Sequence, residues 1–516
     1  MTLDVLIVLV SLTAMFITLI LDKMRPGMVL FSVMAVFLCT GILSPQEMLE
    51  GFSNKGMITV AMLFLVSEGV RRSGALSLVI KKLLPMKPTT VFAAQLRMLP
   101  AIAFISAFLN NTPVVVIFAP IIKRWANYFK MPATYFLIPL SYATILGGVC
   151  TLVGTSTNLV VHSMMQDAGM RGFSMFELSK VGIFIAIVGI VYLFVFSKRL
   201  LPDNRPEQFP NEMDEDDGPY KPTEVVIGAR FPGINQKVTE FDFMRHYGAK
   251  IKEIRRSGDI YTNMTGIRFR ENDTLVVMAD ETFVKTWGES SVFIIIANND
   301  NKEEPIGKKR RWFAIVLLLM MIIGATIGEL PGIERHLPEG IKLDMFFFVA
   351  VTTVLMAWTR MFPARKYTKY ISWDILITIA CAFGISKALE NSGVADMIAS
   401  YIINLSHSYG PYVLLAVMFI ITNIFTELIT NNAAAALSFP IALSISQQLG
   451  VSPMPFFVVI CMAASASFST PIGYQTNLIV QGIGNYKFTD FVRIGLPLNI
   501  ITFLISVFVI PQIWPF

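Results

Sequence analysis

The chain carries nine apolar runs, each near the length of a helix that crosses a membrane, and no other feature restricts its fold as strongly. A membrane-spanning α-helix needs about 20 apolar residues in succession. The composition agrees, because 54% of the residues are apolar and only 15% are charged, against about a quarter in a soluble domain. We therefore predict a polytopic α-helical membrane protein. The apolar runs lie at 2–21, 26–43, 57–70, 132–150, 179–200, 312–330, 343–358, 372–390 and 490–514.

The first apolar run is expected to remain as a membrane helix. It has neither a basic segment before it nor a small-residue cleavage site after it, so it does not have the pattern of a cleaved signal peptide.

One polar region, residues 201–311, interrupts the apolar runs. Its middle part contains short alternating strands such as Ile251–Ile254 and Thr274–Met278, with one helix expected near 239–246. This pattern predicts a small α/β domain inserted between two membrane halves. The predicted order is an N-terminal membrane half at 1–200, an acidic linker at 201–221, the inserted domain at 222–297, a basic linker at 298–311 and a C-terminal membrane half at 312–516.

The two membrane halves contain similar motifs at a nearly constant spacing. FLNNTPVVVIFAP at 108–120 matches LITNNAAAALSFP at 428–440, and TLVGTSTNLVV at 151–161 matches TPIGYQTNLIV at 470–480. A fixed period indicates an internal duplication. Each half thus supplies one segment tipped with Asn and one broken helix. The matched pairs lie 319 or 320 residues apart and are Asn111 with Asn431, Gly154 with Gly473, Asn158 with Asn477, and Ser73-Gly74 with Ser392-Gly393.

The basic residues predict how the two halves are oriented. Lys and Arg cluster at 71–87 and 123–130, whereas the loops near 167–178 and 391–410 carry few. Because basic residues concentrate in cytoplasmic loops, we expect the inserted domain in the cytoplasm and the segment around Asn111 to begin and end on that side. The Asn431 segment is flanked by outer loops. We therefore expect an inverted-repeat transporter with two broken helices and two re-entrant hairpins that enter from opposite faces.

The Asn residues at the two tips are suited to an anion site. Thr112-Pro113 after Asn111 is typical of a helix start, so the tip presents free backbone N–H groups and the positive end of the helix dipole. At Gly154 and Gly473 the broken helices leave carbonyl oxygens that can bind a hard cation. Together these features predict ion-coupled anion transport. The alternative is that the Asn side chains only form hydrogen bonds between helices, worth about 0.6 kcal/mol each.

These motifs resemble those of the divalent anion/sodium symporters of the ion transporter superfamily, over residues 25–200 and 312–516. The matching positions are Asn110-Asn111-Thr112 and Thr430-Asn431-Asn432 at the tips, and Thr155-Ser156-Thr157-Asn158 and Tyr474-Gln475-Thr476-Asn477 at the breaks. The resemblance implies that substrate is bound by Asn110, Asn111, Thr112, Thr155, Thr430, Asn431, Asn432 and Tyr474. It implies that sodium ions are bound by Ser106, Asn111, Gly154, Asn158, Thr426, Asn431, Gly473 and Asn477.

The inserted domain resembles an RCK C-terminal (TrkA-C) domain, through EVVIGARFPGINQKVTEFDFMRHYGAKIKEIRRSGD and RENDTLVVMAD. This combination resembles a branch of the family associated with sulfate. The resemblance implies sodium-coupled symport of a small oxyanion, most directly sulfate, by a multi-pass protein in the lipid of the inner (plasma) membrane. It also implies a homodimer and a small ligand, such as a nucleotide, at the cytoplasmic domain.

Other functions are compatible with the sequence. Dicarboxylate, phosphate or arsenite could take the place of sulfate. Glu427 lies in an apolar segment and could carry a proton, as in a sodium/proton antiporter of the same superfamily, or pair with a Lys. A membrane-anchored ligand sensor is a third class. No paired acids, nucleophile–base set or metal cluster predicts an enzyme, and the spacing of Glu68, Arg71 and Arg72 predicts an ion pair.

Overall fold

The structure is a computed structural model of the chain. It describes residues 2–21, 24–85, 87, 89–203, 221–228, 230–280, 283, 286–287, 292–297, 308–328, 342–405 and 410–516. Most of the two predicted linkers, at 204–220 and 298–307, and most of the predicted outer loop near 331–342 lie outside these residues. In the described part, six helical segments are long and apolar enough to cross a membrane, or seven if one bent pair counts as a span. The chain is therefore a polytopic helical membrane protein.

Helices are the regular secondary structure of the described N-terminal half, and several begin at clear sequence signals. Ser44 and Glu47 form a capping box before the third helix, and the side chain of Asn54 accepts backbone N–H groups at the start of the fourth. The helices are α1 (Leu3–Ile20), α2 (Pro26–Cys39), α3 (Pro45–Ser53), α4 (Lys55–Arg72), α5 (Ala75–Leu83), α6 (Val91–Ser106), α7 (Asn111–Tyr128), α8 (Thr134–Gly148), α9 (Ser156–Asp167) and α10 (Ser179–Leu200).

The C-terminal half repeats this order, with α16 to α22 following the sequence of α4 to α10. The helices α17 to α21 lie outside the nine apolar runs, and of these α18 is long and apolar enough to cross a membrane. The elements are α13 (Lys308–Gly328), α15 (Met345–Trp358), η1 (Ala364–Tyr370), α16 (Trp373–Asn391), α17 (Val394–Leu405), α18 (Gly410–Leu428), α19 (Asn431–Leu449), α20 (Met454–Ser465), α21 (Gln475–Gly484) and α22 (Phe488–Ile513).

Between the halves the chain forms a five-stranded antiparallel sheet in the order β3-β2-β4-β1-β5. The strands predicted at Ile251–Ile254 and Thr274–Met278 lie within β2 and β4. The helix predicted near 239–246 begins later, because the Asp242 side chain accepts the Arg245 N–H at 3.0 Å and caps the helix there. The elements are β1 (Lys221–Ile227), α11 (Phe243–Tyr247), β2 (Lys250–Arg256), β3 (Asp259–Tyr261), β4 (Thr274–Ala279) and β5 (Phe293–Ala297).

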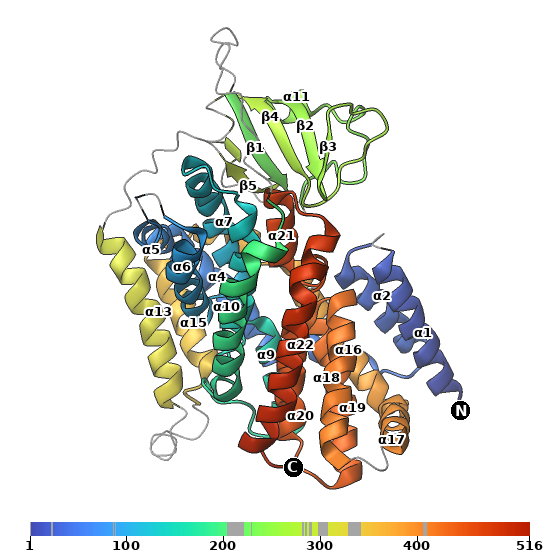
Figure 1. Cartoon of the computed structure of the whole chain (residues 1–516). Helices are drawn as coiled ribbons and strands as arrows, with labels where there is room; N and C mark the ends of the chain where they lie inside the picture. Colours follow the sequence, from blue (N-terminus) through green and yellow to red (C-terminus); the bar gives the residue numbers. More distant parts are fainter. Residues whose placement is uncertain are drawn as a thin grey trace.

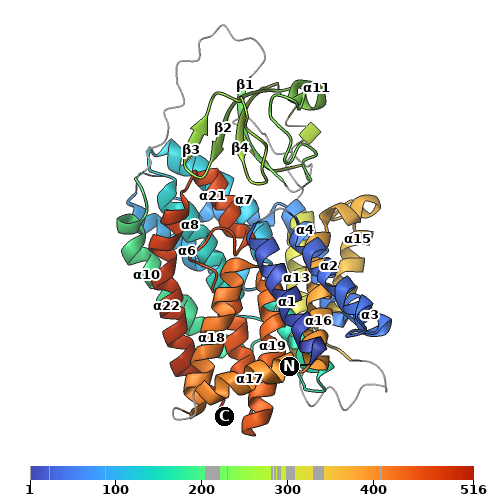
Figure 2. The ribbon, with the colours of Figure 1, turned by 90° about the vertical axis from the view of Figure 1, so that its right-hand side faces the viewer.

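The sheet lies at one end of the helical part, over α7 and α21, in both views (Figures 1 and 2). Glu224 of β1 pairs with Lys123 of α7 at 2.8 Å, and the Thr274 hydroxyl of β4 donates to the Gly482 carbonyl of α21 at 2.8 Å. The Gly258 N–H donates to the Asn485 side chain at 2.8 Å. Of these two helices, α7 begins at the predicted site residue Asn111, and α21 begins at Gln475, directly after the predicted site residue Tyr474.

Candidate functional site

The two Asn-tipped helices begin with the same side-chain contact. The Ser106 hydroxyl donates to Asn111 Oδ1 at 2.6 Å, and the Thr426 hydroxyl donates to Asn431 Oδ1 at 2.8 Å. In each half the hydroxyl residue lies five positions before the Asn. Asn111 is fully buried, and α7 starts at this residue, as the Asn-Thr-Pro sequence predicts. The contact fixes the orientation of each amide, so its NH₂ group and the second lone pair of its oxygen remain to bind something else.

The two helix starts differ in their caps. The Thr430 side chain accepts the Ala433 N–H and caps α19, whereas Asn110 makes no side-chain cap to α7. The first-turn N–H groups of α7 are therefore without a capping side chain. An uncapped helix N-terminus favours an anion, through its free donors and its dipole.

At the breaks, two glycines let the backbone pass close to the helix tips. A side chain at Gly154 would place its Cβ 2.5 Å from the Gly148 carbonyl oxygen and 3.0 Å from that of Ala107. A Cβ at Gly473 would lie 2.7 Å from the Thr426 carbonyl oxygen. These distances are below normal contact, so only Gly fits. The breaks of both halves thus pack against carbonyl groups beside the tip of the same half.

Asn158 and Asn477 hold the unwound segments in place. Asn158 Nδ2 donates to the Thr151 carbonyl at 2.8 Å, and Asn477 Nδ2 donates to the Ser467 carbonyl at 2.8 Å. The amide oxygens differ, because Asn477 Oδ1 accepts the Ser141 hydroxyl at 2.7 Å, whereas Asn158 Oδ1 is buried without a hydrogen-bond partner in the described part of the chain. A buried oxygen without a donor is costly unless something satisfies it, and a sodium ion would do so.

Each helix tip also contacts the broken helix of the other half. The Thr112 hydroxyl donates to Gln475 Oε1 at 3.3 Å, and the Ser156 hydroxyl donates to Asn432 Oδ1 at 3.0 Å. Thr112 matches Asn432 in the repeat, and Ser156 matches Gln475, so these are equivalent contacts. Ser156 and Gln475 are absent from the predicted set of substrate contacts. Their positions next to Thr155 and Tyr474 are the sequence signal that could have included them.

Tyr474 joins the two halves at the centre of this group. Its hydroxyl accepts the amide of Asn111 and lies 3.2 Å from the Thr155 hydroxyl. Its side chain is buried. The structure therefore brings Asn111, Thr112, Thr155, Asn432 and Tyr474 together. Asn110 faces a small cavity that Ser67 and Ser156 also line.

Glu427 forms no ion pair with any described residue. Its carboxylate accepts the N–H groups of Ser469 at 2.8 Å and Thr470 at 2.9 Å, and the Asn499 amide at 2.8 Å. The first two residues belong to the break between α20 and α21. Glu427 thus stabilises the unwound backbone beside the site. Pairing with a Lys, which the sequence left open, is not found in the described residues.

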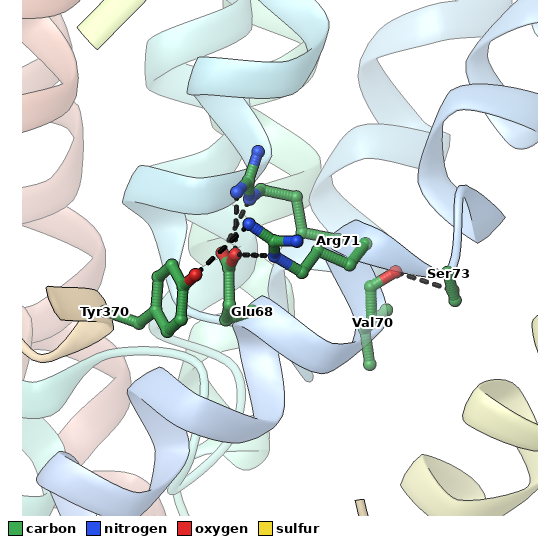
Figure 3. A network of polar contacts seen from close by, with 6 residues as sticks. Glu68, Val70, Arg71, Ser73 and Tyr370 are labelled. Atoms are coloured by element: carbon green, nitrogen blue, oxygen red, sulfur yellow. Dashed lines mark hydrogen bonds and ion pairs between the residues drawn. The ribbon is translucent and has the colours of Figure 1, made fainter. Parts of the chain in front are cut away.

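The predicted ion pair of Glu68 lies elsewhere, at the end of α4 (Figure 3). Its carboxylate accepts from Arg71 Nε at 2.6 Å and from Arg72 Nε at 2.7 Å. Arg72 also donates to the Tyr370 hydroxyl at 3.2 Å and lies over its ring. This cluster joins α4 to η1, and the ion-pair interpretation of Glu68 is confirmed.

The comparisons with known proteins concern nearly the whole chain. The sequence profile of the citrate transporter family matches residues 16–441 and 341–516. An uncharacterised transporter of Synechocystis is 28% identical, covering 91% of this chain and 90% of its own, and one of Escherichia coli is 26% identical, covering 96% of both. Sodium/sulfate cotransporter 1 of Chlamydomonas reinhardtii is 38% identical over 31% of this chain and 18% of its own.

Proposed function

Because the chain belongs to the citrate transporter family, and is thus a multi-pass membrane transporter and not an enzyme, we propose that it imports sulfate, a small oxyanion, together with sodium ions. The observation that carries this proposal is the group of neutral donors at the two helix tips. Amide and hydroxyl groups surround an uncapped helix N-terminus, and no Lys or Arg takes part in the hydrogen bonds of this group among the described residues.

Neutral donors make anion binding dependent on a partner cation. An anion in a low-dielectric site needs a compensating charge, and the helix dipole provides only about half an elementary charge. A sodium ion next to the tip would supply the rest. Symport follows, since each ion would bind weakly without the other.

The residues fit two sodium sites, one in each half. Ser106, Asn111, Gly154 and Asn158 would hold the first, and Thr426, Asn431, Gly473 and Asn477 the second. The support is the close approach of the break glycines to carbonyl oxygens and the unpartnered Oδ1 of Asn158. These ligands are hydroxyl, amide and backbone oxygens, which suit a monovalent hard cation.

Alternating access is proposed to follow the inverted repeat. In this proposal α6–α7 and α18–α19 are re-entrant hairpins that enter from opposite faces, and the bonded tips and broken helices move as one unit. The cross-half contacts of Thr112 and Asn432 support joint movement, because each links a tip to the broken helix of the other half.

The inserted domain, residues 222–297, is proposed to be a cytoplasmic RCK C-terminal-like domain that regulates transport within a homodimer. Its contacts with α7 and α21 support this role. A ligand that binds the domain changes transport only if its affinity differs between the inward-facing and outward-facing states.

The antiporter alternative depends on Glu427 as a proton carrier. Its carboxylate accepts three N–H donors, from the backbone of Ser469 and Thr470 and from the side chain of Asn499. They hold it at the break. This arrangement supports a structural role and not a cycle of proton binding and release.

Uptake of radiolabelled sulfate by proteoliposomes tests the proposal. We expect rapid uptake with an inward sodium gradient and loss of uptake when potassium or choline replaces sodium at constant pH. Competition with phosphate, arsenite and a dicarboxylate identifies the preferred anion. Full uptake driven by a proton gradient alone would contradict sodium coupling and favour Glu427 as the coupling group.

A further inference from the structure

The two halves offer unequal donors to a ligand at the helix tips. In the C-terminal half, Asn431 Nδ2 has no hydrogen-bond partner among the described residues, while its Oδ1 is fixed by Thr426. In the N-terminal half, the matching amide of Asn111 already donates to the Tyr474 hydroxyl. Both N–H groups of the Asn431 amide are therefore free within the described part of the chain, whereas Tyr474 occupies one of the two N–H groups of the Asn111 amide.

This inequality has its origin at one pair of matched positions. Thr155 and Tyr474 both precede the second half of a broken helix and lie 319 residues apart. The contacts that Thr112 and Asn432 make with the broken helix of the opposite half are equivalent in the two halves. Tyr474 is the longer member of its pair, and only its hydroxyl reaches the tip of the opposite half. A Thr at this position could not fill the same space.

We propose that the Tyr474 ring limits the site to a ligand with one compact anionic group. An anion with two separated carboxylates, one at each tip, would need the amide of Asn111 and the space that the phenol occupies. A tetrahedral oxyanion needs only one set of donors, which the Asn431 amide, the Asn432 amide and the uncapped start of α7 provide. This inference rests on the proposed function and assigns Tyr474 the selection between oxyanion and dicarboxylate.

A buried Tyr between helices could also be only a structural contact. In that case its replacement would lower stability and turnover for every substrate to the same extent. A selectivity residue instead changes the ratio of the transport efficiencies of two substrates. Hydrophobic and steric discrimination at one position typically amounts to about 10- to 200-fold, so the ratio is the quantity to measure.

The test compares the wild-type chain with Tyr474→Thr and Tyr474→Phe in proteoliposomes under a sodium gradient. The first variant introduces the residue of the matching position and opens the space. The second removes the hydroxyl but keeps the ring. Labelled sulfate and a labelled four-carbon dicarboxylate are measured separately, and thermal unfolding in detergent checks that each variant is folded.

We expect the wild type to transport sulfate and exclude the dicarboxylate, and we expect Tyr474→Phe to exclude the dicarboxylate whatever its rate with sulfate. Tyr474→Thr should admit the dicarboxylate, with a change of about tenfold or more in the ratio of kcat/KM values. A folded Tyr474→Thr variant that carries sulfate and still excludes the dicarboxylate would overturn the inference, as would a Tyr474→Phe variant that admits it. If Tyr474→Thr fails to fold, admission of the dicarboxylate by Tyr474→Phe would still overturn the inference. A wild type that carries no oxyanion would overturn the proposed function itself.

Discussion

The far ends of α9 and α21, the second halves of the two broken helices, are bound in different ways. Ser163 of α9 donates to Asn54 Oδ1 at 2.7 Å and accepts the Gly56 N–H at 3.2 Å. The C-terminal part of α9 is therefore hydrogen-bonded to the start of α4. The position in α21 that matches Ser163 is Gly482. There the carbonyl accepts the Thr274 hydroxyl of the inserted domain. The same repeat position thus contacts a membrane helix in the N-terminal half and the inserted domain in the C-terminal half.

The difference shows how the inserted domain can reach the site. A Cβ on Gly482 would lie 2.6 Å from the Asn272 carbonyl oxygen, so the contact requires glycine. Lys123 near the end of α7 contacts the same domain through Glu224. Both α7 and α21 begin at the candidate site, at Asn111 and Gln475. The inserted domain thus contacts α7 and α21 at the ends that lie away from the candidate site. Because a rigid helix transmits a displacement from one end to the other, a movement of the domain can reach the site.

The largest expected effect concerns the helix starts at Asn111 and Asn431, which have the same side-chain contact in both halves. Asn111→Ala and Asn431→Ala each remove the side chain that the hydroxyl of Ser106 or Thr426 fixes, together with a central oxygen and donor. We expect at least a 100-fold loss of sulfate uptake, corresponding to about 2.7 kcal/mol. Asn127→Ala, at the far end of α7, is the matched control and should retain uptake. Wild-type kinetics in both tip variants would show that the site lies elsewhere.

A moderate effect on uptake is expected when the inserted domain, which contacts α21, is removed. Replacement of residues 222–290 by a flexible linker removes the contacts of Glu224, Thr274 and Gly258 with the helices. Sodium-dependent uptake should remain measurable, and its response to cytosolic ligands should disappear, since coupling between sites is typically about 1–3 kcal/mol. A folded but inactive deletion would assign the domain a structural role, and unchanged regulation would show that it senses nothing.

Single substitutions at the matched position should separate the two modes of attachment. Ser163→Ala removes two hydrogen bonds and should cost about 1 kcal/mol of stability, seen as a lower Tm in detergent. Gly482→Ala should instead displace the domain and increase hydrogen–deuterium exchange at Gly258, whose N–H donates to Asn485. Exchange at Gly258 should be normal in Ser163→Ala. Equal exchange in both variants would contradict the comparison.

The smallest expected effect is that of mild acid on the domain contact. Burial alone would raise the pKa of Glu224, but Lys123 and Arg255 outweigh it and hold this pKa below the ordinary value of 4.5. Because the folded-state pKa is lowered, the ion pair stabilises the contact above the ordinary pKa and is lost only as the pH falls below it. Docking should therefore be unchanged between pH 7 and pH 5.

Spin labels on cysteines at the exposed positions Tyr128 and Ile260 would report this contact as a distance distribution. Lys123→Met should broaden the distribution at either pH, because it leaves Glu224 with one cation fewer. A distribution that broadens between pH 7 and pH 5 in the chain with Lys123 intact would mean that another group controls docking.

Patterns local in the sequence predicted much of the site. Helical periodicity and the spacing of the repeat predicted the helix starts at Asn111 and Asn431 and the breaks near Gly154 and Gly473. Ser106 and Thr426 came from the family resemblance, as sodium ligands, and their contacts with the Asn amides were not predicted. The cross-half partners Ser156 and Gln475 were missed, since a repeat indicates which positions are equivalent but not which ones touch across the halves.

Other features depend on packing that no sequence pattern encodes. The reach of the Tyr474 hydroxyl to Asn111 depends on how the two halves pack. The N–H donors that surround Glu427 come from an unwound backbone far along the chain. The contact of the inserted domain with Gly482 likewise depends on how the domain packs against the helices, which no sequence motif specifies.

The central claim is that the two Asn-tipped helices form one site that binds sodium and a small oxyanion together. Titration calorimetry of sulfate binding to the purified chain, in sodium and in choline, tests it most directly. We predict that sodium raises the sulfate affinity by about tenfold or more, and that Asn431→Ala abolishes this gain. An affinity for sulfate that is the same in both salts, or a gain that survives Asn431→Ala, would contradict the claim.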